Sequence, residues 1–165
     1  MRPQQSRSSG ENVDELDLRI LAAFAEHPDT TVKTLALTLG IPESTCAYRM
    51  RQLRERGVIT GVRAQFDLSA LGHPVQAMIR VRLGNHSKAG VEKLFDDLVR
   101  TPGVLQVFHI AGADDFLVHV AVRDAVTLRD IVLEQITIHD VVRATETQLV
   151  FELREGVGVV PRGVR

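Results

Sequence analysis

Apolar residues recur at helical spacing in the segments that open the chain. Residues 14–26 carry theirs on one helical face, and the sequence His27-Pro28-Asp29 ends that segment. A second helix is predicted at about Val32–Leu39, followed by Gly40, whose backbone is free to turn sharply. The inward side chains of these two helices are Leu16, Ile20, Leu21, Phe24, Leu35, Ala36 and Leu39.

A third helix is predicted at about Pro42–Arg56 and ends at Gly57. Its inward side chains repeat at i, i+4 and i+7, namely Cys46, Met50 and Leu53. Residues 58–67, VITGVRAQFD, are predicted to form a strand or a short wing that leads out of the domain. Two short helices around a tight turn form a helix-turn-helix, which presents its second helix to the major groove of DNA.

Beyond Leu71-Gly72-His73-Pro74 the pattern changes, because Gln76–Leu83 alternates apolar and polar residues as a strand does. Two further helices are predicted at 88–100 and 125–136, and three further strands at 104–110, 116–122 and 141–153. The order β-α-β-β-α-β predicts a ferredoxin-like sheet with both helices on one face. The fold class is therefore α+β, with a helix-turn-helix domain followed by a ferredoxin-like domain.

The sheet face opposite these helices is also predicted to be apolar. One register of the central hairpin carries Leu105, Val107, Leu117 and Ala121, and the other carries Val104, Phe108, Phe116, Val118 and Val120. Because both sets are apolar, we expect a second subunit to cover the open face and form a homodimer.

The net charge of −1 argues by itself against a nucleic-acid partner, but the charge is unevenly placed. Residues 44–56 hold four arginines and one glutamate. Arginines there would contact phosphates or guanine edges of double-stranded DNA, although a solvated helix face is the alternative. So small a basic patch makes few phosphate contacts, and firm binding needs several copies. The candidate DNA contacts are Ser44, Thr45, Tyr48, Arg49, Arg51, Gln52 and Arg56.

Several classes of protein are disfavoured. No apolar run is long enough to span a membrane, and the first twelve residues lack the apolar core of a secretory signal. The single cysteine, Cys46, excludes an internal disulfide and fits a reducing cytoplasm. We find no nucleophile paired with a base, no Gly-rich phosphate loop and no metal-ligand spacing. We therefore expect a cytoplasmic protein without catalytic residues, metal or cofactor, and without membrane contact.

Together these segments resemble the Lrp/AsnC (feast/famine) family of bacterial and archaeal regulators. The matching positions are Leu16-Asp17…Ile20-Leu21, Leu35-Ala36…Leu39-Gly40, Arg49…Leu53…Gly57-Val58-Ile59, Gly112-x-x-Asp115-Phe116-Leu117 and Thr145-x-Thr147. The resemblance implies a winged helix-turn-helix and a RAM/ACT-like domain. It also implies amino-acid or related effectors bound at subunit interfaces, dimers that assemble further into octamers, and DNA that is wrapped or bent.

The resemblance implies an effector site at the predicted hairpin loop. One carboxylate there would accept hydrogen bonds from an ammonium group, while backbone amides or threonine hydroxyls hold the effector's carboxylate. Because Asp and Gly are also the default turn residues, an ordinary turn is the alternative. Two adjacent acidic groups suggest a cationic effector such as arginine or lysine. The candidate residues are Gly112, Ala113, Asp114, Asp115, Thr145 and Thr147.

Three positions depart from the family pattern. Pro42 stands where the family usually has a serine N-cap, so the third helix is expected to begin with proline in its first turn. Asp114 replaces a common aromatic residue, and Val141 replaces a common glycine.

Two histidines of the central hairpin suggest alternatives to this function. His109 and His119 are predicted to be cross-strand neighbours on the dimer face, where an interface pair is favoured over a metal site or a pH switch. An enzyme that resembles sirohaem decarboxylases would use both histidines with Arg80 and Arg82 around a tetrapyrrole, although an enzyme has no need of the arginine-rich helix. An unrelated winged-helix regulator is disfavoured by the βαββαβ half.

The expected organisation has five parts. These are a disordered tail at 1–12, the helix-turn-helix domain at 13–60, a linker strand at 61–74, the ferredoxin-like oligomerisation and effector domain at 75–153, and a loose C-terminal tail at 154–165.

Overall fold

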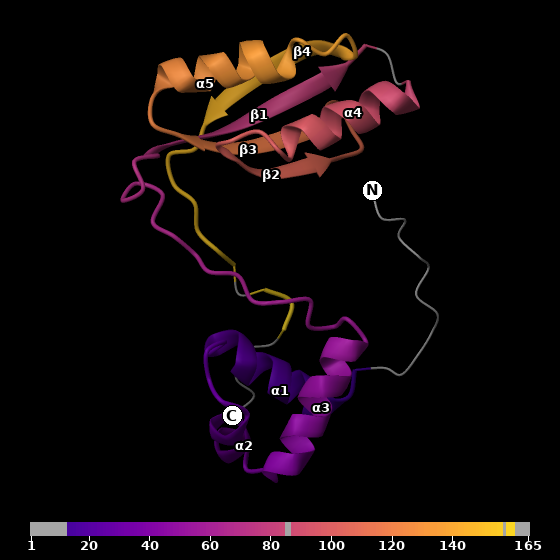
Figure 1. Cartoon of the computed structure of the whole chain (residues 1–165), viewed down its shortest axis with the longest axis vertical. Coiled ribbons are helices and arrows are strands. Elements are labelled where there is room, and N and C mark those ends of the chain that lie inside the picture. The colour runs from indigo at the N-terminus through magenta and orange to yellow at the C-terminus, as the bar shows by residue number, and fades with distance from the viewer. Residues whose placement is uncertain (1–12, 85–86, 157, 161–165) are drawn as a thin grey trace. The chain divides into compact units, whose positions relative to one another are not determined.

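The computed structural model describes residues 13–84, 87–156 and 158–160. The chain divides into two compact units, one of residues 1–64 with 154–165 and one of residues 65–153 (Figure 1). The tail predicted at 1–12 lies outside the described residues, as do residues 157 and 161–165 of the predicted C-terminal tail.

The N-terminal unit is a three-helix helix-turn-helix, as predicted. Its helices are α1 (Glu15–Glu26), α2 (Val32–Leu39) and α3 (Glu43–Glu55). Asp14 and Asp17 form a capping box at the start of α1, and Thr31 caps α2. Gly40 ends α2 in a left-handed conformation with φ 65°. The buried core consists of Ile20, Leu35, Ala36, Cys46, Met50 and Leu53.

Two expectations for this unit were wrong. Pro42 is the N-cap of α3 and lies just before the first turn, in which we expected it, although the expected loss of a side-chain cap hydrogen bond is confirmed. Residues 58–74 form no strand, and turns occupy 68–72. A strand is stabilised by cross-strand hydrogen bonds, and no described strand pairs with this segment.

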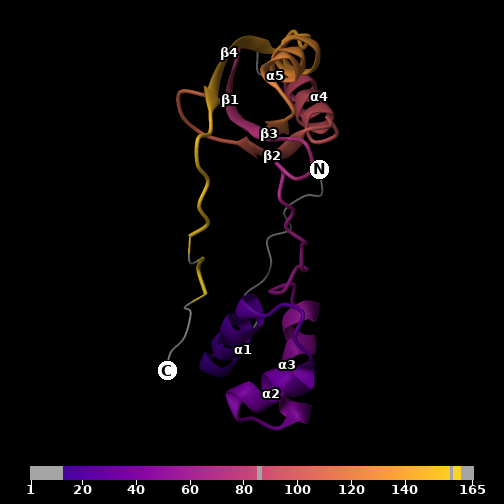
Figure 2. The ribbon, with the colours of Figure 1, turned by 90° about the vertical axis from the view of Figure 1, so that its left-hand side faces the viewer.

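The C-terminal unit is a four-stranded antiparallel sheet with helices on one face (Figure 2). The strand order β2-β3-β1-β4 confirms the ferredoxin-like topology. The strands are β1 (Val75–Leu83), β2 (Val104–His109), β3 (Phe116–Val122) and β4 (Val142–Leu149). The helices are α4 (Lys88–Leu98), α5 (Ala125–Ile131) and a π-helical turn, η1 (Val132–Ile136), so the helix predicted at 125–136 changes its winding midway.

Alternate residues of β1 separate the two faces of the sheet. Ala77, Ile79 and Val81 are fully buried beneath the helices and pack against the side chains of β3 and α4. Their neighbours Met78 and Arg80 lie on the open face, opposite His119 and Leu117 of β3.

The predicted pairing of His109 with His119 was wrong. In the structure His109 lies opposite Phe116, and His119 lies opposite Gln106. The predicted hairpin register differs from the observed one by three residues, and an odd slip moves one member of a pair to the other face. The His109 ring stacks on Phe116 with centroids 4.5 Å apart, whereas Nε2 of His119 lies 3.0 Å from Oε1 of Gln76 on the open face.

Candidate DNA interface and effector loop

The third helix presents one stripe of side chains to solvent. Ser44, Tyr48 and Arg51 are exposed and follow each other at helical spacing, opposite the buried stripe that contains Met50 and Leu53. Tyr48 is 53% exposed. These three predicted DNA contacts therefore share one accessible surface of α3.

The other four predicted contacts, Thr45, Arg49, Gln52 and Arg56, form a second stripe that is half-buried. Gln52 donates a hydrogen bond of 2.9 Å from Nε2 to Glu55 on the same helix. The structure therefore distributes the seven predicted residues over two adjacent stripes.

Arg49 and Arg56 reach across to the first turn of α1. Nη1 of Arg49 donates to Oδ2 of Asp14 and lies 3.2 Å from Oδ1 of Asp17, and Nη1 of Arg56 lies 3.5 Å from Oδ2 of Asp17. Asp17 is 1% exposed. A hydrogen bond from the Asp17 amide, together with Arg49, lowers the pKa of the Asp14 carboxyl, and Asp14 in turn raises the pKa of Arg49.

The acidic partners of these arginines were missed by the sequence reasoning. The spacing Asp14-x-x-Asp17 before an apolar run is a capping-box signal, so their role at the helix start was detectable. Their pairing with residues more than thirty positions away was not.

The predicted effector loop is the β2–β3 connection, residues 110–115. The Ile110 amide donates to the Asp115 carbonyl at 2.9 Å and closes the loop, while the Asp115 amide donates to the Val81 carbonyl. Gly112 and Ala113 are exposed at its tip. Within the described chain, the amides of Gly112 and Ala113 have no hydrogen-bond partner.

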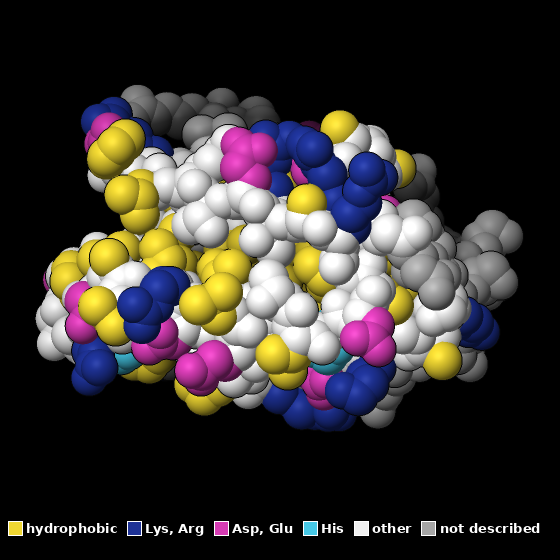
Figure 3. All heavy atoms as spheres, turned by 90° about the horizontal axis from the view of Figure 1, so that it is seen from above, with side chains coloured by type: hydrophobic (Ala, Val, Ile, Leu, Met, Phe, Trp, Pro, Cys, Tyr) yellow, Lys and Arg dark blue, Asp and Glu magenta, His cyan; other side chains and the backbone are white. Residues whose placement is uncertain are grey.

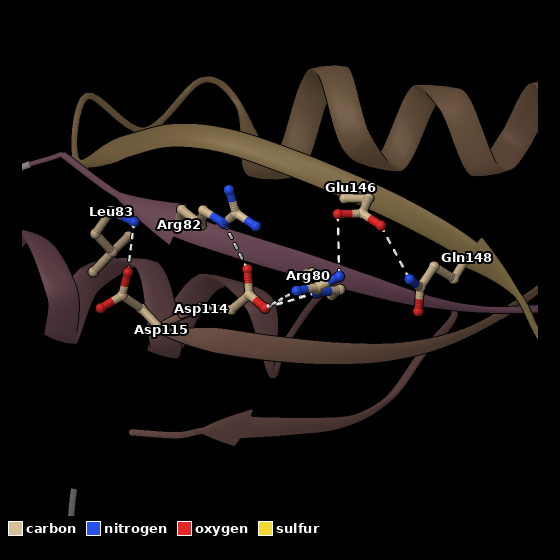
Figure 4. Close-up of polar contacts among 7 residues, drawn as sticks. All are labelled: Arg80, Arg82, Leu83, Asp114, Asp115, Glu146 and Gln148. Carbon is tan, nitrogen blue, oxygen red and sulfur yellow. Dashed lines mark hydrogen bonds and ion pairs between the residues drawn. The ribbon is translucent and has the colours of Figure 1, made fainter. Parts of the chain in front are cut away.

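Asp114 is 6% exposed and is held by two arginines of β1 (Figure 4). Nε of Arg80 donates to Oδ2 at 2.7 Å, and Nε of Arg82 donates to Oδ1 at 2.8 Å. These hydrogen bonds, that from Arg82 first, lower the pKa of the Asp114 carboxyl. Arg80 also contacts Glu146 of β4 at 3.2 Å.

This arrangement removes the basis for a cationic effector. Both carboxylate oxygens of Asp114 are already bound to guanidinium groups, and Oδ2 of Asp115 accepts the Leu83 amide at 2.7 Å. The charge of Asp114 is therefore compensated by two arginines, and one oxygen of Asp115 is already occupied by a backbone amide.

Thr145 and Thr147 lie on the helix-covered face of the sheet, not on the open face that carries Arg80. They pair with Val81 and Ile79, whose side chains face the helices, whereas Asp114 contacts Arg80 and Arg82 on the open face. Within one subunit the structure does not bring the threonines together with the acidic loop residues.

The open face of the sheet carries a few apolar side chains among polar ones. Phe108 is 43% exposed and lies opposite Leu117, which lies opposite Arg80. The face is therefore more polar than predicted, because Arg80, Glu146 and Gln148 lie on it.

Figure 3 shows hydrophobic side chains gathered in patches between charged ones on another face of the molecule. Exposed hydrophobic side chains of this unit's helical layer include Val99, Val126, Leu133 and Ile138.

The described residues contain no cluster of three or more histidine, cysteine or acidic side chains that could hold a metal ion. None of the helices that the structure describes is long and apolar enough to cross a membrane. Burial raises the pKa of the Cys46 thiol, as expected for a core cysteine.

Comparisons with known proteins agree with this architecture. Residues 13–60 match the model of a winged helix-turn-helix DNA-binding domain, and residues 76–154 match that of the Lrp/AsnC ligand binding domain. The HTH-type transcriptional regulator AldR of Mycobacterium tuberculosis is 38% identical over 148 residues, which cover 90% of this chain and 83% of AldR. The leucine-responsive regulatory protein of Rhizobium meliloti is 31% identical over 83% of this chain and 88% of its own length.

Solved structures show the same fold. The crystal structure of MtbAldR superposes with a TM-score of 0.72 at 35% identity and covers 90% of this chain and 97% of its own. E. coli AsnC superposes with a TM-score of 0.79 at 24% identity and covers 92% and 100%. The fold and site define a helix-turn-helix transcriptional regulator with a ligand-binding domain. The chain belongs to the Lrp/AsnC family.

Proposed function

We propose that this protein regulates transcription by inserting α3 into the major groove of double-stranded DNA. The observation that carries the proposal is the accessible stripe of Ser44, Tyr48 and Arg51 on the second helix of the helix-turn-helix. Hydroxyl groups and a guanidinium are donors suited to phosphate oxygens and base edges. Thr45 and Gln52 lie beside this stripe and complete the surface.

We propose that the functional unit is a homodimer that assembles further into an octamer. One α3 offers few cations, so affinity gained from counterion release requires several subunits on one operator. The apolar side chains Phe108 and Leu117 on the open sheet face support a dimer through this face. Family membership supports oligomerisation, and light scattering measures its order.

We propose that an amino acid binds at the 110–115 loop, between neighbouring subunits. The exposed, unbonded amides of Gly112 and Ala113 support this location, because backbone amides bind carboxylates. A Neisseria meningitidis regulator of the same fold was crystallised as its L-Met complex, with a TM-score of 0.83 at 23% identity. Thr145 and Thr147, on the opposite face, would serve an effector shared with another subunit. Asp114 and Asp115 would shape the loop and accept an ammonium only by exchanging their present partners.

The test combines DNA binding with an effector screen. Fluorescence anisotropy with duplexes from the region upstream of its own gene should show salt-dependent binding at nanomolar to micromolar protein. Each of the twenty amino acids is then added, with thermal shift and light scattering recorded in parallel. No binding to any duplex at low salt contradicts the DNA-binding proposal, and twenty amino acids without effect contradict the effector proposal.

We further propose that the protein is cytoplasmic and is not an enzyme. The four residues of the decarboxylase alternative do not lie on one face of the sheet, because His109 stacks on the buried Phe116 while His119, Arg80 and Arg82 lie on the open face. A purified protein that acquires a Soret band with haem-like ligands and ignores DNA would reverse this proposal.

A further inference from the structure

Three of the four arginines in residues 44–56 fall into two groups with different surroundings, and the fourth, Arg54, lies 6.0 Å from the centroid of the Phe24 ring. We infer that Arg49 and Arg56 hold α3 in position through Asp17 and do not contact DNA. Arg51, on the exposed stripe of α3, supplies the phosphate contact instead. The inference rests on the proposed function and assigns separate roles to residues that share one charge and one helix.

The anchor for α3 is a carboxylate inside the unit. The Asp17 side chain is 2% exposed, with Arg49 on Oδ1 and Arg56 on Oδ2. The two arginines are seven residues apart, so their Cα atoms are separated by two turns, roughly 10 Å along the helix. Two attachments at this spacing restrain both the tilt of α3 and its rotation about its own axis.

Arg49 also joins the capping box of α1. Asp14 accepts the Asp17 amide at 2.8 Å through Oδ1 and binds Nη1 of Arg49 through Oδ2. Both carboxylates lie at a helix N-terminus, where the helix dipole favours negative charge. Nη1 of Arg49 makes both contacts, so the charge that Arg49 could offer a phosphate is already offset by two carboxylates.

Arg51 has a different environment. It is exposed, lies three residues after Tyr48 and seven after Ser44 on the same stripe, and has no polar partner in the described parts of the chain. A phosphate that approaches this stripe meets an unpaired guanidinium. Arg51 can therefore displace counterions without breaking an internal contact.

The test compares Arg49→Gln with Arg51→Gln in the full-length protein. Each variant removes one positive charge from the same helix, so long-range attraction to DNA falls equally. The dissociation constant is measured by anisotropy between about 50 and 200 mM salt on the tightest duplex found for the wild type. Circular dichroism first establishes that each variant is folded.

For Arg51→Gln we expect binding to weaken about 5- to 20-fold, and the slope of log K against log salt to shrink by about 0.9 for each bound subunit. For Arg49→Gln we expect binding to weaken at least about 3-fold. The factor should be the same at every salt concentration. An Arg49→Gln slope that shrinks as much as that of Arg51→Gln overturns the inference, and so does an Arg49→Gln affinity equal to that of the wild type.

A variant on α1 keeps the inference testable if Arg49→Gln fails to fold. Asp17→Asn keeps the side-chain size but removes the negative charge that Arg49 and Arg56 share. We expect weaker DNA binding with an unchanged salt slope, although no residue of α3 is altered. An unchanged affinity overturns the inference alone. A wild-type protein that binds no duplex overturns the proposed function itself.

Discussion

Replacing Asp17 by asparagine removes a single negative charge from the interior of the helix-turn-helix unit. The side chain keeps its size, and its carbonyl oxygen can still accept the Asp14 amide, which lies 3.4 Å from Oδ2 in the native protein. The change therefore tests the charge of the anchor rather than the packing of α1.

The structure sets the expected magnitude. Breaking a fully buried ion pair costs about 3–5 kcal/mol, whereas an exposed pair contributes about 0–1 kcal/mol. The Asp17 side chain is 2% exposed, but its partners Arg49 and Arg56 are 32% and 22% exposed and recover part of their hydration. We therefore expect Asp17→Asn to lower the free energy of unfolding by about 1.5–3 kcal/mol, the range for a hydrogen bond to a charged group.

Urea unfolding of the full-length protein measures this loss. The chain has no tryptophan and one tyrosine, Tyr48 of α3, so tyrosine fluorescence reports on the N-terminal unit alone. With a urea dependence of about 1 kcal/mol per molar for so small a unit, the midpoint should fall by about 1.5–3 M. Urea carries no charge, so the experiment can be repeated in high salt, where the effect of a buried charge should persist.

Asp29→Asn is the matched control, because Asp29 is exposed in the loop between α1 and α2. It should change the free energy of unfolding by no more than the few tenths of a kcal/mol typical of surface substitutions. If Asp17→Asn behaves like this control, the buried carboxylate does not anchor α3, and the reasoning is refuted.

Three further predictions concern the C-terminal unit. Gly90→Ala should destabilise it by about 1–3 kcal/mol in urea unfolding, because the new Cβ would lie 2.5 Å from Cγ1 of the buried Val141; a stabilisation, as helix propensity alone predicts, would contradict this. The pKa of the Asp114 carboxyl is lowered in the folded state, so its stabilising contribution is present above the unfolded value near 3.8 and is lost as the pH falls through the folded pKa; Asp114→Asn should flatten that acid limb in unfolding curves, and an unchanged limb would exclude Asp114 as its source. Burial lowers the pKa of His119, so the unfolded chain binds a proton more readily and stability falls as the pH drops below about 6.5; His119→Gln should reduce this fall, as measured by midpoints at pH 7.5 and 5.5, and an equal fall would contradict the assignment.

The helices and strands were largely predictable because their signals are local. Asp14 and Thr31 cap α1 and α2, Gly40 and Gly57 end helices with positive φ, and the alternation in Gln76–Leu83 defines β1. Each signal depends on neighbours within a few residues, so it survives without knowledge of the fold. The order βαββαβ then followed from the sequence of elements alone.

The hairpin register and the neighbours of charged side chains were not predictable in this way. Both registers of β2 and β3 looked apolar, so the pattern could not decide whether His109 or Gln106 lies opposite His119. The observed pairing depends on the loop length and on an irregularity between Val104 and Gln106.

The amino-acid sequence alone therefore determined most of the helices and strands of this protein, their order, and the helix that carries the positive charge. Only the tertiary structure decided that Arg49 is held by Asp17, that Arg51 faces solvent, and that Asp114 is neutralised by Arg80 and Arg82. The physical reason is range. Caps and periodicity act along the chain, whereas these ion pairs join residues thirty or more positions apart and exist only after the chain has packed.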